Sequence, residues 1–257
     1  MAHRHRPRKR FGQNFLHDPG VIERIVRHIA PRPGQHLVEI GPGQGALTAP
    51  LLAAAGELEV VELDRDLIPG LRGLGSGIHI HQADALRFDF RRLQRAPDDH
   101  LRIVGNLPYN ISTPLLFHLI EQIDCIADMH FMLQREVVER LAAGPGSKRY
   151  GRLSVMVQYH CAVEKLLLVG PGAFRPPPQV ESAVVRLLPH ARPPAQVSDY
   201  AAFAHLVNRC FAQRRKTLRR VLKDTLDEHR IRQAGIDPAL RPENLSLAQF
   251  AALSELL

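Results

Sequence analysis

The chain has 257 residues, of which 45% are hydrophobic, and this is enough to bury the core of one large domain with a smaller addition. Its 34 Lys and Arg residues exceed its 26 Asp and Glu residues, so the formal net charge of +8 favours a polyanionic partner. No apolar stretch approaches the roughly 20 residues of a membrane span, and no apolar segment with a cleavage site follows the basic N-terminus. We therefore expect neither a membrane helix nor a secretory signal.

The N-terminus combines a basic tail with a helix. Five of the first ten residues are Arg or Lys, which predicts a mobile tail. Asp18 followed by Pro19 indicates a helix start, because Asp caps free N–H groups and proline suits the first helical position. The stretch VIERIVRHIA (21–30) has apolar residues at helical spacing and ends before Pro31.

Strands and helices then alternate as far as residue 134. The sequence predicts a glycine-rich turn at 41–45, a helix at 46–56, and strands at 36–41, 57–64, 77–84, 101–106 and 128–134. Such alternation predicts an α/β fold with a parallel sheet that is covered on both faces. After PHARPPAQVSD (189–199), which is typical of a linker, several short helical patterns rich in Arg predict a small helical domain.

Cysteine and histidine usage predicts a metal-free protein of the cytoplasm. Cys125, Cys161 and Cys210 are odd in number, widely separated and without the spacing of metal ligands, so they are typical of free thiols in a reducing compartment. The 14 histidines form no ligand pattern either. We expect no bound metal.

The glycine-rich turn in EIGPGQG (39–45) lies where the first strand passes into a helix. Gly41, Gly43 and Gly45 allow a tight turn and close approach of a ligand, although three glycines alone are equally compatible with a structural turn. The spacing differs from the dinucleotide fingerprint, and the Lys of a phosphate-binding loop is missing. An NAD-dependent dehydrogenase is therefore disfavoured.

Acidic residues end three successive strands, namely Glu39, Glu62 and Asp84. The carboxyl ends of parallel strands meet at one crevice, so these side chains should converge. Carboxylates suit a cofactor that carries ribose hydroxyls, an adenine amine and positive charge. S-adenosylmethionine has all of these features, and the pattern favours it.

The tetrapeptide that begins at Asn106 follows the fourth predicted strand and contains no acid, base or covalent nucleophile. A structural turn stiffened by Pro108 would explain it equally well. Opposite a methyl donor, however, the Asn106 side-chain oxygen and a backbone carbonyl, for which we choose Leu107, would accept the hydrogens of an adenine amine and favour charge on its nitrogen. Tyr109 would offer a face on which the extruded base stacks.

At this point the chain resembles a known family, the KsgA-type small-subunit ribosomal RNA adenine dimethyltransferases. The resemblance runs from Arg8 nearly to the C-terminus, with the family's motifs in order. The motifs are RKRFGQNFL, EIGPGQGALT, VELDRD, GNLPYNISTP, FRPPPQVESAVVRL, QRRKTLRR and ENLSLAQF.

The resemblance implies a Rossmann-like S-adenosylmethionine-dependent methyltransferase domain with a small helical C-terminal domain. We divide the chain into a basic tail and cofactor-covering segment (1–18), a methyltransferase domain (19–188) and a helical domain (189–257). The implied activity is transfer of two methyl groups to each of two adjacent adenosines near the 3′ end of small-subunit rRNA. The implied cofactor contacts are Asn14, Leu16, Gly41, Glu62, Asp84 and Asn106, of which Asn14 and Leu16 come from the resemblance alone.

Phe174 precedes three prolines that force an extended path. A lone aromatic in such a place is most often a buried anchor of a stiff loop. The resemblance instead implies that Phe174 is a second stacking wall for the target adenine, opposite Tyr109.

The stretch NRCFAQRRKTLRRVLK (208–223) has seven basic residues between Arg209 and Lys223. On one helix, Phe211, Leu218 and Leu222 would pack inward and basic side chains would face solvent. A solvated cationic face is the usual role of such a run, but the charge of +8 favours phosphate contacts. The expected RNA-binding residues are Arg214, Arg215, Lys216, Arg219, Arg220, Lys223, Lys148 and Arg149.

Two alternatives stay open at this stage. A DNA adenine methyltransferase typically has Asn-Pro-Pro-Tyr, whereas Leu107 occupies the second position here. A ribosome-assembly checkpoint protein would bind an immature small subunit, with methylation secondary. We expect small-subunit rRNA and the immature small subunit as partners, and a monomer.

Overall fold

The computed structural model describes residues 13–257, so the predicted basic tail lies outside the described residues. Contacts divide the chain into two compact units, each made of non-contiguous segments. One unit runs to Val138 and resumes at Glu164–Pro189, and the other comprises Glu139–Val163 and His190–Leu257. The linear boundaries expected from the sequence remain a prediction.

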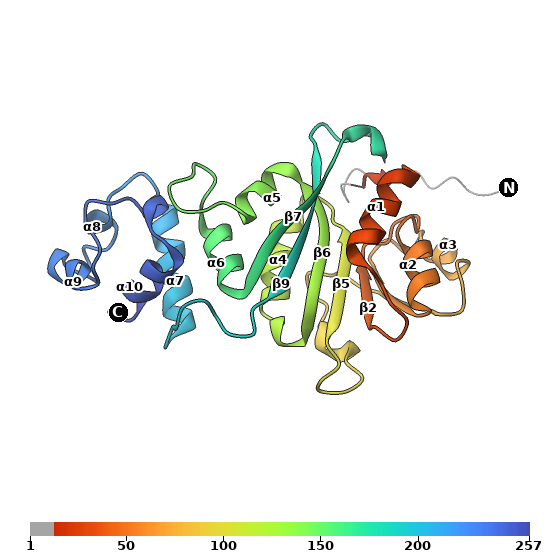
Figure 1. The fold of residues 1–257 in the computed structure, drawn as a ribbon, viewed down its shortest axis with the longest axis horizontal. Coiled ribbons are helices and arrows are strands. Elements are labelled where there is room, and N and C mark those ends of the chain that lie inside the picture. Colours follow the sequence, from red (N-terminus) through yellow and green to blue (C-terminus); the bar gives the residue numbers. More distant parts are fainter. Residues whose placement is uncertain (1–12) are drawn as a thin grey trace. The chain divides into compact units, whose positions relative to one another are not determined.

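The first unit contains a seven-stranded sheet with the order β4-β3-β2-β5-β6-β9-β7, and its central strands are labelled in Figure 1. Strands β2 to β6 run parallel, and β9 pairs antiparallel with β6. The strands are β2 (Leu37–Ile40), β3 (Leu58–Glu62), β4 (Ile78–Gln82), β5 (Leu101–Asn106), β6 (Ile126–Gln134), β7 (Cys161–Val169) and β9 (Ser182–Pro189). The prediction of an α/β fold with a central parallel sheet is confirmed.

Helices and short turns connect these strands. Asp18 caps the first helix through a hydrogen bond from the Val21 N–H to its carboxylate, so the predicted helix start is confirmed. The helices are α1 (Pro19–Ile29), α2 (Thr48–Ala55), α3 (Ile68–Arg72), α4 (Ser112–Ile120) and α5 (Arg135–Leu141). The 3₁₀ turns are η2 (Phe90–Leu93), η3 (Ile123–Cys125) and η4 (Pro171–Ala173).

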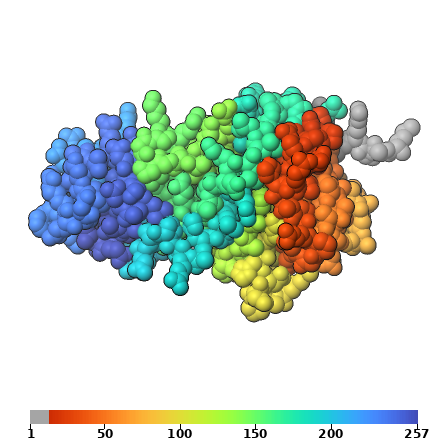
Figure 2. Space-filling view, viewed as in Figure 1, coloured from red at the N-terminus to blue at the C-terminus, as the bar shows by residue number. Residues whose placement is uncertain are grey.

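A two-stranded ribbon brings the N-terminal segment next to a distant part of the chain. Strand β1 (Phe15–Leu16) pairs antiparallel with β8 (Phe174–Arg175), with Leu16 opposite Phe174. Figure 2 shows the teal segment that contains β8 beside the red N-terminal segment. The ribbon therefore fixes the segment that the resemblance assigns to cofactor covering.

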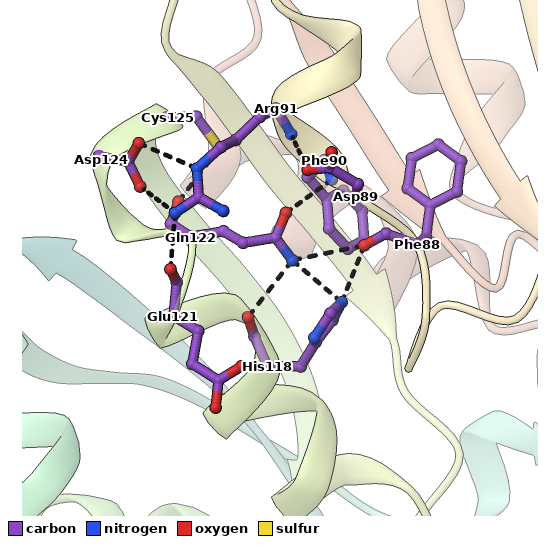
Figure 3. A network of polar contacts seen from close by, with 9 residues as sticks. All are labelled: Phe88, Asp89, Phe90, Arg91, His118, Glu121, Gln122, Asp124 and Cys125. Atoms are coloured by element: carbon purple, nitrogen blue, oxygen red, sulfur yellow. Dashed lines mark hydrogen bonds and ion pairs between the residues drawn. The ribbon is translucent and has the colours of Figure 1, made fainter. Parts of the chain in front are cut away.

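A buried amide fastens the loop after β4 to the end of α4 (Figure 3). Gln122 is only 4% exposed, and its side-chain oxygen accepts a hydrogen bond from the Phe90 backbone N–H at 2.7 Å. Arg91 donates to both carboxylate oxygens of Asp124 and to the Glu121 carbonyl. These contacts join the segment that follows Asp84 to the helix that follows the Asn106 tetrapeptide.

The second unit is helical. It contains α6 (Arg152–His160), α7 (Tyr200–Ala212), α8 (Leu218–Val221), α9 (Glu228–Gln233), η5 (Pro242–Asn244) and α10 (Leu247–Ser254). The edge-on ring contacts of Tyr150 with Phe211, at 5.9 Å, join its two chain segments.

The expectation of one helix through the basic stretch is wrong. Helix α7 ends at Ala212, and α8 begins only after Thr217. The Leu218 N–H donates to the Leu240 carbonyl, so a contact with a distant segment replaces the hydrogen bond that a continuous helix would make.

The described residues contain neither a membrane-spanning helix nor a group of metal-binding side chains. None of the helices within residues 13–257 combines the length and apolar character that crossing a bilayer requires. The same residues include no group of three or more His, Cys, Asp or Glu side chains that could hold a metal ion.

Candidate active site

A cavity of about 300 Å³ lies in the first unit at the carboxyl ends of β2, β3, β4 and β5. Segments from before β1 to the start of α4 line it. The lining includes Asn14, Leu16, Glu39, Gly41, Gly43, Glu62, Leu63, Asp64, Asp84, Asn106, Leu107 and Tyr109. Ligands bind in this position in open α/β sheets, because the strand ends leave a crevice between loops.

The glycine turn forms one wall of the cavity. Gly41, Gly43 and Gly45 all have positive φ angles, of 66°, 59° and 84°, which other residues adopt only with strain. A Cβ atom on Gly43 would also lie 3.1 Å from the Phe15 ring. The turn thus brings bare backbone to the cavity, as the sequence predicted for a ligand-binding loop.

Glu62, at the end of β3, is held from both sides. Its two carboxylate oxygens accept hydrogen bonds from the N–H groups of Gly43 at 3.2 Å and Asp64 at 2.7 Å. The side chain is buried, and this desolvation raises its pKa above the ordinary value. A fixed carboxylate of this kind is suited to accept hydrogen bonds from ligand hydroxyls.

Glu39, on β2, is 1% exposed and lines the same cavity. Burial raises its pKa to about 7, although the Thr48 hydroxyl donates to it at 2.7 Å and opposes this rise. The nearby Glu62 raises the pKa further. The cavity therefore contains a carboxyl group that gains or loses its proton near neutral pH.

Asn106 is positioned by a residue far away in the sequence. Its side-chain nitrogen donates to the Asn14 backbone carbonyl at 3.0 Å, which leaves the side-chain oxygen as the atom that can accept. Gly105 makes this placement possible, because a Cβ there would lie 2.5 Å from the Ile40 carbonyl oxygen. Leu107 follows, and its N–H donates to the Met132 carbonyl at 3.1 Å.

Tyr109 lines the cavity, and its hydroxyl lies 2.7 Å from the Ser182 hydroxyl. Phe174 is only 3% exposed and belongs to the hydrophobic cluster beneath the ribbon, where Leu16 is its strand partner. It is not among the residues that line the cavity. Its role as a second stacking wall therefore stays a prediction, and its burial matches the alternative of a loop anchor.

The structure brings together every residue expected to bind the cofactor. Asn14, Leu16, Gly41, Glu62, Asp84 and Asn106 all line the cavity. Sequence reasoning missed Asp64, which is 2% exposed and accepts from Gln13 at 3.2 Å. It also missed Leu63, an exposed apolar side chain at the cavity. Both residues belong to the VELDRD motif (61–66), which could have identified them, but only Glu62 was assigned a role from the sequence.

The basic residues expected to bind RNA lie in the second unit and differ in their surroundings. Arg214, Arg149 and Arg219 form ion pairs with Glu243, Glu139 and Glu228, respectively. Arg214 also donates to the Ser147 carbonyl at 3.2 Å and is half-buried, so it braces a loop instead of facing solvent as expected. Within residues 13–257, the remaining members are exposed and form no ion pair. They are Lys148, Arg215, Lys216, Arg220 and Lys223.

The cavity residues fit the cofactor that the resemblance implies. The glycine turn brings bare backbone to the cavity, with open space beside Gly41, and four carboxyl groups line it and can accept hydrogen bonds from hydroxyl, amine and ammonium groups. Leu63 and Ile40 supply apolar surface for a flat ring. S-adenosylmethionine combines these groups, and Asn14, Glu62 and Asp84 are the polar residues that would hold it.

Comparisons with known proteins agree with this arrangement. The model of the ribosomal RNA adenine dimethylase family matches residues 4–257. The Ribosomal RNA small subunit methyltransferase A of Pseudomonas fluorescens (strain Pf0-1) is 58% identical over 99% of this chain and 94% of its own length.

Two solved structures share the fold at 26% sequence identity. A dimethyladenosine transferase from Plasmodium falciparum has a TM-score of 0.76 and covers 93% of this chain and 95% of its own. The 23S rRNA methyltransferase ErmE has a TM-score of 0.75 and covers 95% of this chain and 99% of its own. The chain belongs to the ribosomal RNA adenine dimethylase family, and it is an S-adenosylmethionine-dependent methyltransferase.

Proposed function

We propose that this enzyme methylates the N6 amines of two adjacent adenosines near the 3′ end of small-subunit rRNA, and that each amine receives two methyl groups. The observation that carries the proposal is the placement of Asn106 beside the acid-lined cavity, with its nitrogen tied to Asn14 and its oxygen left to accept. S-adenosylmethionine supplies an electrophilic methyl group when it is bound.

The chain's own residues account for the reactivity of the target amine. The lone pair of an adenine amine is delocalised into the ring, so the nitrogen becomes nucleophilic when acceptors bind its hydrogens. We assign this role to the Asn106 side-chain oxygen and the Leu107 carbonyl, which are fixed before the reaction begins. Tyr109 stacks against the extruded base. No general base is required, because the amine acquires positive charge as it attacks and can lose its proton afterwards.

Similarity favours the small subunit over the large one. The relative named for the small subunit is 58% identical to this chain, whereas the 23S rRNA methyltransferase is 26% identical. We therefore assign the substrate to small-subunit rRNA within an immature small ribosomal subunit, and the place of action to the cytoplasm. The enzyme is proposed to act as a monomer, which light scattering of the purified protein would test.

RNA phosphates are the proposed partners of the exposed basic side chains of the second unit. Arg215, Lys216, Arg220 and Lys223 are exposed without ion pairs in the described part of the chain, so phosphate contact would break no existing interaction. Arg214, Arg219, Lys148 and Arg149 complete the proposed set. Phe174 is proposed as a support of the target base.

Methyl transfer to purified particles tests this function. Labelled S-adenosylmethionine is incubated with the enzyme and unmethylated small-subunit particles, and the labelled nucleoside is identified. Dimethyladenosine at two adjacent positions is expected. Large-subunit rRNA and adenine-containing DNA serve as competing substrates, and label on either of them in place of small-subunit RNA would contradict the assignment.

A further inference from the structure

Ser182 is a buried residue of the FRPPPQVESAVVRL motif to which the activity described above gives no role. It is the first residue of β9 and is 0% exposed. Its hydroxyl lies 2.7 Å from that of Tyr109, although 73 residues separate the two in the chain. The motif therefore reaches the cavity through one side-chain hydrogen bond.

The surroundings fix the position of Ser182 itself. It is the strand partner of Gln134 at the end of β6. The preceding residue, Glu181, accepts a hydrogen bond from the Arg135 backbone N–H at 2.9 Å and forms an ion pair with the Arg135 side chain at 2.6 Å. The Ser182 hydroxyl is thus held on the sheet and does not move with the loop that carries Tyr109.

Two distant segments hold the two ends of the catalytic tetrapeptide. At one end the Asn106 side chain is bonded to the Asn14 carbonyl, and at the other the Tyr109 hydroxyl is bonded to Ser182. The Ser112 hydroxyl donates to the Tyr109 carbonyl at 3.1 Å and so fixes the backbone at the end of the tetrapeptide. Because the phenol oxygen lies on the axis of the ring's second torsion, an anchor at this atom fixes the direction of the ring axis and therefore where the ring lies in the cavity.

An acid–base role for this pair is not supported. Burial raises the pKa of Tyr109 above its usual value, so the phenol stays protonated near neutral pH. Among residues 13–257, the serine hydroxyl forms a hydrogen bond with the Tyr109 hydroxyl and with no basic side chain. The hydrogen bond can therefore act on catalysis only through the orientation of the ring.

We propose that Ser182 is a positioning residue for methyl transfer, which orients the Tyr109 ring against the target adenine through the hydrogen bond between the two hydroxyls. This inference rests on the proposed function, because it requires an adenine that stacks on Tyr109. It assigns a role to a contact between the sheet and the tetrapeptide that does not involve substrate directly.

A double-mutant cycle tests the proposal. Ser182→Ala, Tyr109→Phe and the double variant are compared with the wild type in methyl transfer to unmethylated small-subunit particles. Each single substitution is expected to lower kcat about tenfold, which corresponds to one hydrogen bond, and the double variant should be no worse than the poorer single variant. Calorimetric titration with S-adenosylhomocysteine should show cofactor affinity within about twofold of wild type for all three.

Two controls separate orientation from general damage. Ser254→Ala removes another buried serine hydroxyl, which donates to the Ala251 carbonyl in α10, and should leave kcat unchanged. Tyr109→Ala removes the ring and should lose more activity than Tyr109→Phe. Wild-type kcat in Ser182→Ala, or losses that multiply in the double variant, would overturn the proposal. A wild-type enzyme that does not methylate the particles would instead overturn the proposed function, and this inference with it.

Discussion

The pKa values of acidic residues shift in opposite directions at the two ends of the same sheet. Glu59 and Glu62 lie three residues apart on β3. Burial opposes the ionisation of Glu59, but the neighbouring His36 and His81 imidazoles outweigh it and lower its pKa to about 2. At the cavity, burial raises the pKa values of Glu62 and Glu39, and their hydrogen bonds within the described residues come from backbone N–H groups and the Thr48 hydroxyl, not from basic side chains.

The two ends therefore serve different purposes. Away from the cavity, His36 lies 2.6 Å from Asp99 and 3.8 Å from Glu59, and these carboxylates raise its pKa. In that cluster, acidic and basic side chains lie next to each other as ion pairs. The cavity carboxyl groups can accept further hydrogen bonds from a ligand. Without a ligand, their burial lowers the stability of the folded protein. Substitutions at the cavity should mainly change activity, and substitutions in the cluster should mainly change stability.

The largest effect is expected for Asn106→Ala. Loss of the acceptor oxygen should lower kcat about 100-fold or more, because a preorganised contact to the transition state disappears. Asn106 is half-buried, so the midpoint of thermal unfolding should change little. Methyl transfer to small-subunit particles measures kcat, and calorimetry measures the midpoint of unfolding. An unchanged kcat would rule out the role assigned to Asn106.

Glu59→Gln should show the reverse pattern. The substitution removes the carboxylate that pairs with His36 and His81, and about 1–3 kcal/mol of stability should be lost at neutral pH. The pKa of Glu59 is lowered on folding, so the wild type holds this stability above about pH 4.5 and loses it as the pH falls towards 2. Urea unfolding of both proteins should therefore converge at low pH, while kcat at neutral pH stays at the wild-type level.

Glu62→Gln should weaken cofactor binding about tenfold, because a neutral amide accepts hydrogen bonds more weakly than a carboxylate. Calorimetric titration with S-adenosylhomocysteine measures this change. The matched control is Glu57→Gln, which alters an exposed carboxylate paired with Arg95. Equal affinities for both variants would contradict the assignment of Glu62 to the cofactor.

The smallest effect is expected for Glu39→Gln in the ligand-free protein. The pKa of Glu39 is raised to about 7 on folding, so the wild type loses stability as the pH rises from about 4.5 through 7. The neutral variant lacks this loss, so its stability relative to the wild type should increase as the pH rises from 5 to 8. Thermal unfolding at the two pH values is the measurement. A gain that is equal at both would show that Glu39 does not titrate in this range.

Local patterns were enough to predict the parallel half of the fold. Strands β2, β3, β5 and β6 are largely apolar runs, and β4 alternates Ile with His. The acids at the ends of β2, β3 and β4 converge because parallel strands end at one edge. Strand β7 was missed, since its half-exposed residues show no regular alternation. Strand β9 was missed because its continuous apolar run follows three prolines.

Contacts between distant residues account for the remaining failures. The hydrogen bond of Asn106 to Asn14 spans 92 residues, and only family resemblance placed Asn14 at the cavity. The lowered pKa of Glu59 could not be predicted from β3 itself, because it comes from His36, which precedes β2, and from His81 on β4. The break after Ala212 likewise depends on the Leu240 carbonyl.

The helical unit consists of two separate segments of the chain, and this limits how it can be transferred to another protein. A fragment that begins at His190 would lack Tyr150, the ring neighbour of Phe211, and the Ser147 carbonyl that receives Arg214. A hybrid enzyme meant to exchange RNA preference with a relative must therefore transplant residues 139–163 together with 190–257. A single splice near Pro189 would produce mismatched halves of one core.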